Sequence, residues 1–422
     1  MKRKFETDEV LKSDLPFSFS SFVLLNPLGG SANPLGLMSY QSKLARQLLP
    51  QFTVLTSKPR YHALLCGIIC ALNELKIDVS SSSARECEIL WGLAQAVLLR
   101  DEPDRVIVPL NIRRYNRILT TLKENGTTAT LEFAKHRKFG LMEHLNYGVW
   151  GFYINPSREW RLVNDSFKSL SPLGNKLGKA FLDGTGYVEL IKKWYNGKNI
   201  SDRDLKKFGE LSSLDQEPTK DEKSAWSDVL KTFLNDYERL YPAWTAIWDV
   251  LPNVNVKRAE GKLGAILEAQ SHFDAAANWL EFAFELCYLK SDKNQGVDLK
   301  EIDRATLYNE CATALNSYEK TRGMFGDQPL LFKEALSAKD FNDLNRKILA
   351  VHNFIQDKKS KSPYISREGK MIQSNSLNCE RALKFLPELH GKSLAELKQQ
   401  LFELYQRDWH FPRAAIYKES FK

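Results

Sequence analysis

The sequence predicts a mainly α-helical protein, built from multi-helix bundles with one small α+β segment. Apolar residues recur at helical spacing along most of the chain, and residues typical of helix starts precede several of these runs. Two short aromatic and β-branched runs flank a proline-containing turn near residues 149–163, which predicts a β-hairpin there. The α+β segment is therefore expected around that hairpin, between two helical parts of the chain.

The first 105 residues are expected to form a bundle of three helices. Asn33-Pro34 is typical of a helix start, because asparagine caps the first turn and proline fits the first helical position. A second helix follows Pro59 and is apolar on nearly every side from Ala63 to Leu72, which indicates burial. The capping-box pattern Ser83-Ala-Arg-Glu86 predicts the start of the third helix.

The middle block combines helices with β-prone segments. Its predicted elements are a helix Asn111–Glu124, a β-prone stretch Thr127–Leu131, a helix Glu132–Leu145, hairpin strands Val149–Ile154 and Glu159–Val163, and a helix begun by Ser171 and Pro172. The hairpin turn contains Asn155-Pro156, in which proline fixes one backbone angle and asparagine tolerates unusual ones.

From Thr219 onward the pattern is almost wholly helical. Thr219-Lys-Asp-Glu222 is a capping box ahead of apolar residues at helical spacing. The further predicted helices are about Arg258–Leu289, Glu301–Tyr318, Lys339–Phe354, Ser376–Leu386 and a last one from the capping box Ser393–Glu396 to Tyr405. The aromatic segment Trp409–Arg413 comes after the last predicted helix. It is interpreted as a docking peptide, either for a partner or for the protein's own bundle.

The amino-acid composition limits the classes of protein to which the chain can belong. The 422 residues are 43% hydrophobic and 11% aromatic, as in folded globular proteins. The net charge of +8 is a mild basic excess, which is compatible with an anionic partner without requiring one. Six sparse cysteines do not resemble a disulfide framework, so a cytoplasmic location is expected. Neither a signal peptide nor a membrane span is expected, since no apolar run reaches about 18 residues.

Residues 110–183 resemble a winged-helix module. The residues that carry the resemblance are the helix Tyr115–Lys123, the segment Lys135–Leu145 in the place of a recognition helix, the hairpin at 149–163 and the passage Leu170–Phe181. The resemblance implies a helix in the DNA major groove and a wing on the adjacent backbone. Three domains are therefore expected: an N-terminal helical bundle (1–105), a winged-helix-like module (106–185) and a C-terminal helical domain (186–422).

Seven basic residues of the middle block are the predicted nucleic-acid-binding residues. They are Arg113, Arg114, Arg117, Lys135, Arg137, Lys138 and Arg158. Their charges would neutralise phosphates of double-stranded DNA, and any sequence preference is left open. The alternatives that remain open are a winged-helix fold used for protein contacts and ordinary solvated helix faces.

Residues 35–61 resemble the N-terminal region of uncharacterised bacterial proteins that travel with mobile elements and phage-defence loci. The segments that carry the resemblance are Leu35–Pro50 and Thr53–Tyr61. The resemblance implies a context of antiviral defence and membership of a protein complex, and it implies no catalytic activity.

No local pattern in the sequence indicates catalysis. His62, Cys66 and Cys70 are spaced four residues apart, so one helix face carries all three, and either zinc binding or plain core packing would explain them. No metal, cofactor or catalytic residue is predicted, and no histidine lies in a local signature with a nucleophile. The expected function is a non-enzymatic DNA-binding or adaptor subunit with a protein partner. The alternatives are a protein scaffold without nucleic-acid affinity and an enzyme whose site assembles from distant residues.

Overall fold

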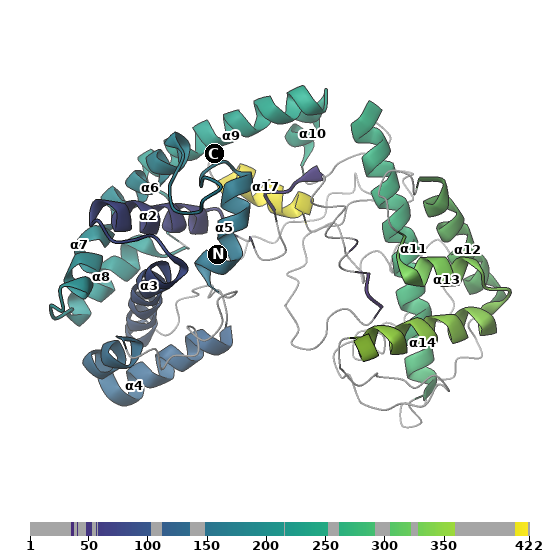
Figure 1. Cartoon of the computed structure of the whole chain (residues 1–422), viewed down its shortest axis with the longest axis horizontal. Helices are drawn as coiled ribbons and strands as arrows, with labels where there is room; N and C mark the ends of the chain where they lie inside the picture. The colour runs from purple at the N-terminus through teal and green to yellow at the C-terminus, as the bar shows by residue number, and fades with distance from the viewer. Residues whose placement is uncertain are drawn as a thin grey trace. The chain divides into compact units, whose positions relative to one another are not determined.

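A computed structural model of the whole chain shows a mainly α-helical protein (Figure 1). The structure describes residues 35–37, 40, 48–52, 56, 58–102, 112–135, 148–214, 216–251, 261–291, 304–321, 328–358 and 410–420. The chain forms two compact units: unit 1 comprises residues 1–48 and 246–412, and unit 2 comprises residues 49–245 and 413–422. The boundaries predicted near residues 105 and 185 both fall inside unit 2.

Unit 2 is organised around a buried helix, α2 (Arg60–Glu74). Every residue of α2 from Arg60 to Leu72 is buried, as expected for a helix with apolar residues on nearly all sides. Helices α3, α5, α6 and α7 pack against it. The other helices of unit 2 are α3 (Ser81–Asp101), α4 (Ile112–Lys135), α5 (Val149–Glu159), α6 (Pro172–Thr185), α7 (Tyr187–Tyr195), α8 (Asp202–Ser212) and α9 (Lys220–Leu240).

Unit 1 has its own core around a second long helix, α11 (Gly261–Ser291). Helix α11 packs against α12 (Arg304–Thr321) and α14 (Phe341–Lys358), and α13 (Leu330–Leu336) packs against both of these. The chain passes from one unit to the other after Leu48, within α10 (Trp244–Val250) and within α17 (His410–Ser420). None of the helices in the described ranges is both long and apolar enough to span a bilayer.

Local capping signals predicted two helix starts correctly. Thr219 caps α9 by accepting a hydrogen bond from the Glu222 amide at 3.2 Å, and the Glu222 carboxylate accepts one from the Thr219 amide at 3.0 Å. Ser171 caps α6, which begins at Pro172 and ends at Gly186 in the left-handed conformation. The start of α3 was predicted three residues too late, because Ser80 and Ser83 form the capping box that begins it.

The predicted hairpin at 149–163 is wrong, because residues Val149–Glu159 form the helix α5. Val149, Tyr153, Ser157 and Trp160 are buried at intervals of four, four and three residues, which is the period of a helix. Aromatic and β-branched residues favour strands, but only weakly, and tertiary packing overrides that preference in this segment. These residues therefore show no wing of a winged-helix module.

The β-prone stretch predicted at Thr127–Leu131 is also helical, as part of α4. Gly126 interrupts that helix with φ 72° and ψ 176°, a conformation that glycine adopts without a Cβ clash. The predicted helix end at Asn125-Gly126 is therefore present as a kink, beyond which the chain continues as helix. Within the described residues, the isolated bridge between Val163 and Leu170 is the sole β-type pairing.

The close contact of α6 with α2 depends on Gly178. A Cβ at this position would lie 2.7 Å from the Cys66 carbonyl oxygen and 2.7 Å from Cys70 Sγ. We expect Gly178→Ala to lower the free energy of unfolding by about 1–3 kcal/mol, because backbone and core must shift. Gly92→Ala in α3 is the matched control, since its Cβ would meet only Ile118 Cδ1 at 3.6 Å. The control should gain roughly 0.5–1 kcal/mol from helix propensity, and urea unfolding of both variants measures the difference.

Candidate nucleic-acid interface

Helix α4 carries most of the predicted DNA-contacting residues that the structure describes. Two of its side chains, Ile118 and Leu122, are almost wholly buried at 2% and 1% exposure. They hold the helix on α3, where the Gly92 position approaches Ile118 Cδ1. After the kink at Gly126, the Thr130 hydroxyl donates to the Gly126 carbonyl oxygen at 2.6 Å. One face of α4 is thereby fixed to unit 2, which leaves the opposite face for solvent or a partner.

Three predicted arginines lie in the first two turns of α4. Helical spacing places Arg113 and Arg117 in one row with Thr120 and Glu124, because these residues are separated by four, three and four positions. Thr120 and Glu124 are both exposed. Helical spacing thus places positions 113 and 117 on the same side of α4 as these two exposed residues. Arg114 lies three positions before Arg117 but four before Ile118, so its position falls between that row and the row of the two buried residues.

The remaining predicted residues are distributed differently. Lys135 is the last residue of α4, and Arg137 and Lys138 lie outside the described residues. Arg158 belongs to α5 rather than to a wing. Its Nη2 atom is 3.2 Å from Glu159 Oε1, and its guanidinium carbon is 5.3 Å from the centre of the Phe167 ring. The charge of Arg158 is thus compensated within α5, and α4 carries the stronger part of the predicted site.

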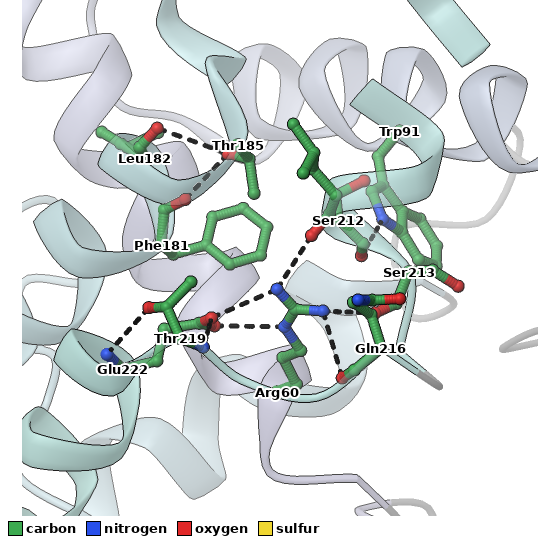
Figure 2. A network of polar contacts seen from close by, with 11 residues as sticks. Arg60, Trp91, Phe181, Leu182, Thr185, Ser212, Ser213, Gln216, Thr219 and Glu222 are labelled. Carbon is green, nitrogen blue, oxygen red and sulfur yellow. Dashed lines mark hydrogen bonds and ion pairs between the residues drawn. The ribbon is translucent and has the colours of Figure 1, made fainter. Parts of the chain in front are cut away.

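A buried polar network around Arg60 holds the framework of unit 2 together (Figure 2). Arg60 Nε and Nη2 each lie 3.1 Å from a different carboxylate oxygen of Glu222, and both residues are almost fully buried. The same guanidinium donates to the carbonyl oxygens of Leu211, Ser213 and Gln216. Arg60 therefore ties the start of α9 to the segment after α8.

The end of α8 also receives hydrogen bonds from α3. Trp91 Nε1 donates to the Ser212 carbonyl oxygen at 3.3 Å, and Gln95 Nε2 donates to the Gly209 carbonyl oxygen at 3.1 Å. The last carbonyl groups of a helix lack partners within the helix, so buried ones need donors from elsewhere. Arg60, Trp91 and Gln95 supply those donors, which identifies this network as structural.

His62 occupies a second buried network, apart from the cysteines with which it shares a helix face. Its Nδ1 atom is 2.6 Å from Ser157 Oγ, and its Nε2 atom is 3.0 Å from the Tyr417 hydroxyl oxygen. Burial lowers the pKa of His62 to about 3, so the ring is neutral at physiological pH. Both ring nitrogens therefore have hydroxyl partners in place of a metal.

The two cysteines of α2 lie in the packed contact with α6. Cys70 Sγ is 3.3 Å from Asn175 Oδ1, and Cys66 is completely buried. Burial raises the pKa of Cys66 well above its ordinary value and raises the pKa of Cys70 to about 11. Both thiols are therefore protonated near neutral pH, as expected for cysteines packed in an apolar core. Across the described parts of the chain, no three His, Cys, Asp or Glu side chains are grouped as a metal site.

Glu88 of α3 caps the start of α5. Its carboxylate accepts hydrogen bonds from the backbone amides of Trp150 and Val149, while the residue before the helix is Gly148, which has no side chain to cap it. Burial raises the pKa of Glu88 to about 7, and the two amide hydrogen bonds and Arg85 act in the opposite direction. Gly148 has φ 111°, a conformation that L side chains rarely adopt, and a Cβ there would also contact the Glu88 carboxylate, so glycine suits this position.

These networks escaped prediction because their partners are distant in sequence. Arg60 and Glu222 are separated by 162 positions, and His62 and Tyr417 by 355. The capping box at Thr219 was a signal for Glu222, but nothing local linked it to Arg60. Comparisons with protein-family models, with curated proteins and with solved structures find no match to this chain.

Proposed function

We propose that this protein is a non-enzymatic DNA-binding or adaptor subunit, of the kind used in antiviral defence or DNA-transaction complexes, and that α4 contacts the DNA backbone. The observation that carries the proposal is the arginine row at the start of α4. Arg113, Arg114 and Arg117 precede any acidic residue of the helix, the first of which is Glu124. Three cations within five residues can neutralise several phosphates of a duplex.

The position of these arginines within the helix supports an anionic partner. The N-terminal end of a helix carries a partial positive charge, so cations there weaken the isolated helix and anions strengthen it. The first turn of α4 contains no acidic residue. Arginines at this end therefore do not serve the stability of α4, whereas a bound phosphate would be attracted by both the arginines and the helix end.

Charge reversal tests the proposal. We expect the triple variant Arg113→Glu, Arg114→Glu, Arg117→Glu to lose at least roughly tenfold in affinity for a labelled duplex at low salt, because about three phosphate contacts would disappear. The loss should be similar for duplexes of unrelated sequence, because phosphates carry no sequence information. Fluorescence anisotropy measures both quantities.

The matched control changes the same amount of charge elsewhere in unit 2. Lys198, Arg203 and Lys207 are exposed residues in and before α8. Replacing all three by glutamate should weaken binding only slightly, through the smaller net charge. If the two triple variants lost the same affinity for the duplex, net charge alone would explain the loss. The proposal that α4 contacts DNA would then be wrong.

A further inference from the structure

Tyr417 of α17 lies among tryptophan rings in the core of unit 2. Its side chain is completely buried, and its ring is stacked on that of Trp160, with an interplanar angle of 4° and 5.8 Å between the ring centres. The Trp226 ring lies edge to face with it at 5.9 Å. Phenol and indole rings are among the side-chain groups that lose one electron most readily. The cluster therefore brings oxidisable rings of two kinds into direct contact.

Tyr417 also has a base beside its hydroxyl group. The hydroxyl oxygen is 3.0 Å from His62 Nε2, and His62 Nδ1 is 2.6 Å from Ser157 Oγ. The imidazole is neutral at rest, because burial lowers the pKa of His62 to about 3. When Nδ1–H donates to Ser157, Nε2 is free to accept the phenol proton. A phenol gives up an electron far more easily when its proton has an acceptor within hydrogen-bond reach, since the phenol radical cation is a very strong acid.

Neighbouring aromatic side chains lack that arrangement. Among the described residues, no hydrogen-bond partner lies at the buried Nε1 atoms of Trp160 and Trp244, although most buried polar atoms in proteins have one. The Tyr237 hydroxyl donates to Gln51 Oε1 at 3.1 Å, and an amide oxygen is a much weaker base than an imidazole. An indole that loses an electron here keeps its proton and remains an oxidising cation. It will take an electron from a ring that can release a proton, and Tyr417 is that ring.

Trp160 connects Tyr417 with other tryptophans of unit 2. Its ring centre is 5.7 Å from that of Trp226. The Phe233 ring contacts both Trp160, at 5.0 Å between ring centres, and Trp244, at 6.5 Å. Electrons tunnel readily across single ring contacts, so an electron vacancy on either of these indoles can reach Trp160.

We propose that Tyr417 and His62 form a redox site, at which an electron vacancy created in the tryptophans of unit 2 by a one-electron oxidant comes to rest. Tyr417 gives an electron to the oxidised Trp160, and its hydroxyl proton moves to His62 Nε2. The products are a restored indole, a neutral tyrosyl radical and an imidazolium. The positive charge passes from one buried ring to another, so no additional charge is buried. An electron from a thiolate, together with return of the proton from His62, restores the pair. The inference is independent of the proposed DNA contact.

Laser flash photoionisation of the unaltered full-length protein tests this redox site. The flash ejects electrons from buried and exposed tryptophans alike, and hexamminecobalt(III) captures them. We expect the absorption of tryptophan radicals to decay as that of a tyrosyl radical appears, at a rate that is independent of protein concentration. The rate should be lower in heavy water, because a proton moves with the electron. Absence of this intramolecular phase in the unaltered protein would overturn the proposal, whether or not any variant folds.

Two tyrosine variants locate the radical. Tyr417→Phe should remove most of the tyrosyl radical formed by the intramolecular phase. Tyr187→Phe is the matched control and should keep it, because the Tyr187 phenol is equally buried but donates to the backbone carbonyl oxygen of Cys87. His62→Asn keeps the phenol and removes the base, so it should slow the phase. An unchanged yield of tyrosyl radical in Tyr417→Phe would contradict the proposal.

Discussion

Replacing Arg60 by methionine is expected to lower the free energy of unfolding of unit 2 by about 3–5 kcal/mol, because Glu222 then becomes a buried carboxylate without its cation. The substitution also removes the donor to the carbonyl oxygens of Leu211, Ser213 and Gln216. The contact with the buried Ser213 carbonyl group adds most to the loss, because a buried acceptor that loses a donor costs about 1–3 kcal/mol. Equilibrium unfolding in guanidinium chloride measures the loss of stability. Hydrogen exchange of the α2 amides, measured separately under native conditions, shows whether the loss lies in unit 2.

Two further variants separate the ion pair from the backbone contacts. Arg60→Met combined with Glu222→Leu removes both charges, so it should recover part of the loss but remain less stable than the unaltered protein. The exposed pair Lys192–Glu189 at 3.8 Å is the control, and Lys192→Met should cost less than about 1 kcal/mol. A loss below about 1 kcal/mol in Arg60→Met would contradict the structural role of the network.

Unit 2 contains two buried groups whose effects on stability oppose one another between pH 4.5 and 6.5. The pKa of His62 falls from 6.5 to about 3 on folding, and the pKa of Glu88 rises from 4.5 to about 7. Below pH 6.5 His62 is protonated in the unfolded state, whereas in the folded state it stays neutral down to about pH 3. The free energy of unfolding therefore falls as the pH is lowered below 6.5. Above pH 4.5 the folded state keeps a proton on Glu88 that the unfolded state releases, so stability falls as pH rises.

Each group changes the free energy of unfolding by at most about 1.4 kcal/mol per pH unit within this window. Because the two slopes have opposite signs, they should nearly cancel in the unaltered protein. Glu88→Gln removes one slope, so its stability should rise with pH by up to about 3 kcal/mol from pH 4.5 to 6.5. His62→Asn removes the other, so its stability should fall with pH over the same range.

Chemical denaturation at several pH values gives these slopes. The prediction concerns the change in the free energy of unfolding with pH and not its absolute value. A variant that is less stable at every pH can therefore still be compared with the unaltered protein. Parallel pH profiles in the two variants would show that these groups do not titrate as their burial indicates.

The sequence was sufficient where structure depends on neighbouring residues. Thr219 and Glu222 predicted the start of α9, and Ser171 with Pro172 predicted the start of α6, because a cap involves groups only three residues apart. The apolar run in α2 likewise predicted its burial. The interpretation of Trp409–Arg413 as a docking peptide stays a prediction: Trp409 lies outside the described residues, and the last four residues form the start of α17, in which Phe411 is buried.

The sequence was insufficient where a distant residue decides the outcome. The cap of α5 comes from Glu88, 62 positions before Trp150, so nothing near Val149 announced a helix start. The helical period of Val149, Tyr153 and Trp160 was present in the sequence, but the strand propensity of the run concealed it. Of the predicted DNA-binding residues, the structure gathers Arg113, Arg114 and Arg117 on one helix and places Arg158 on another.

The central proposal, DNA-backbone contact by a basic surface, is tested most directly by a salt titration of the unaltered full-length protein. The anisotropy of a short labelled duplex would be followed from low to high salt, for two duplexes of unrelated sequence. We predict binding at low salt that weakens linearly in log–log form, with a slope near −0.9 for each phosphate contacted and nearly the same slope for both sequences. An absence of binding even at low salt would contradict the proposal and favour a protein scaffold without nucleic-acid affinity.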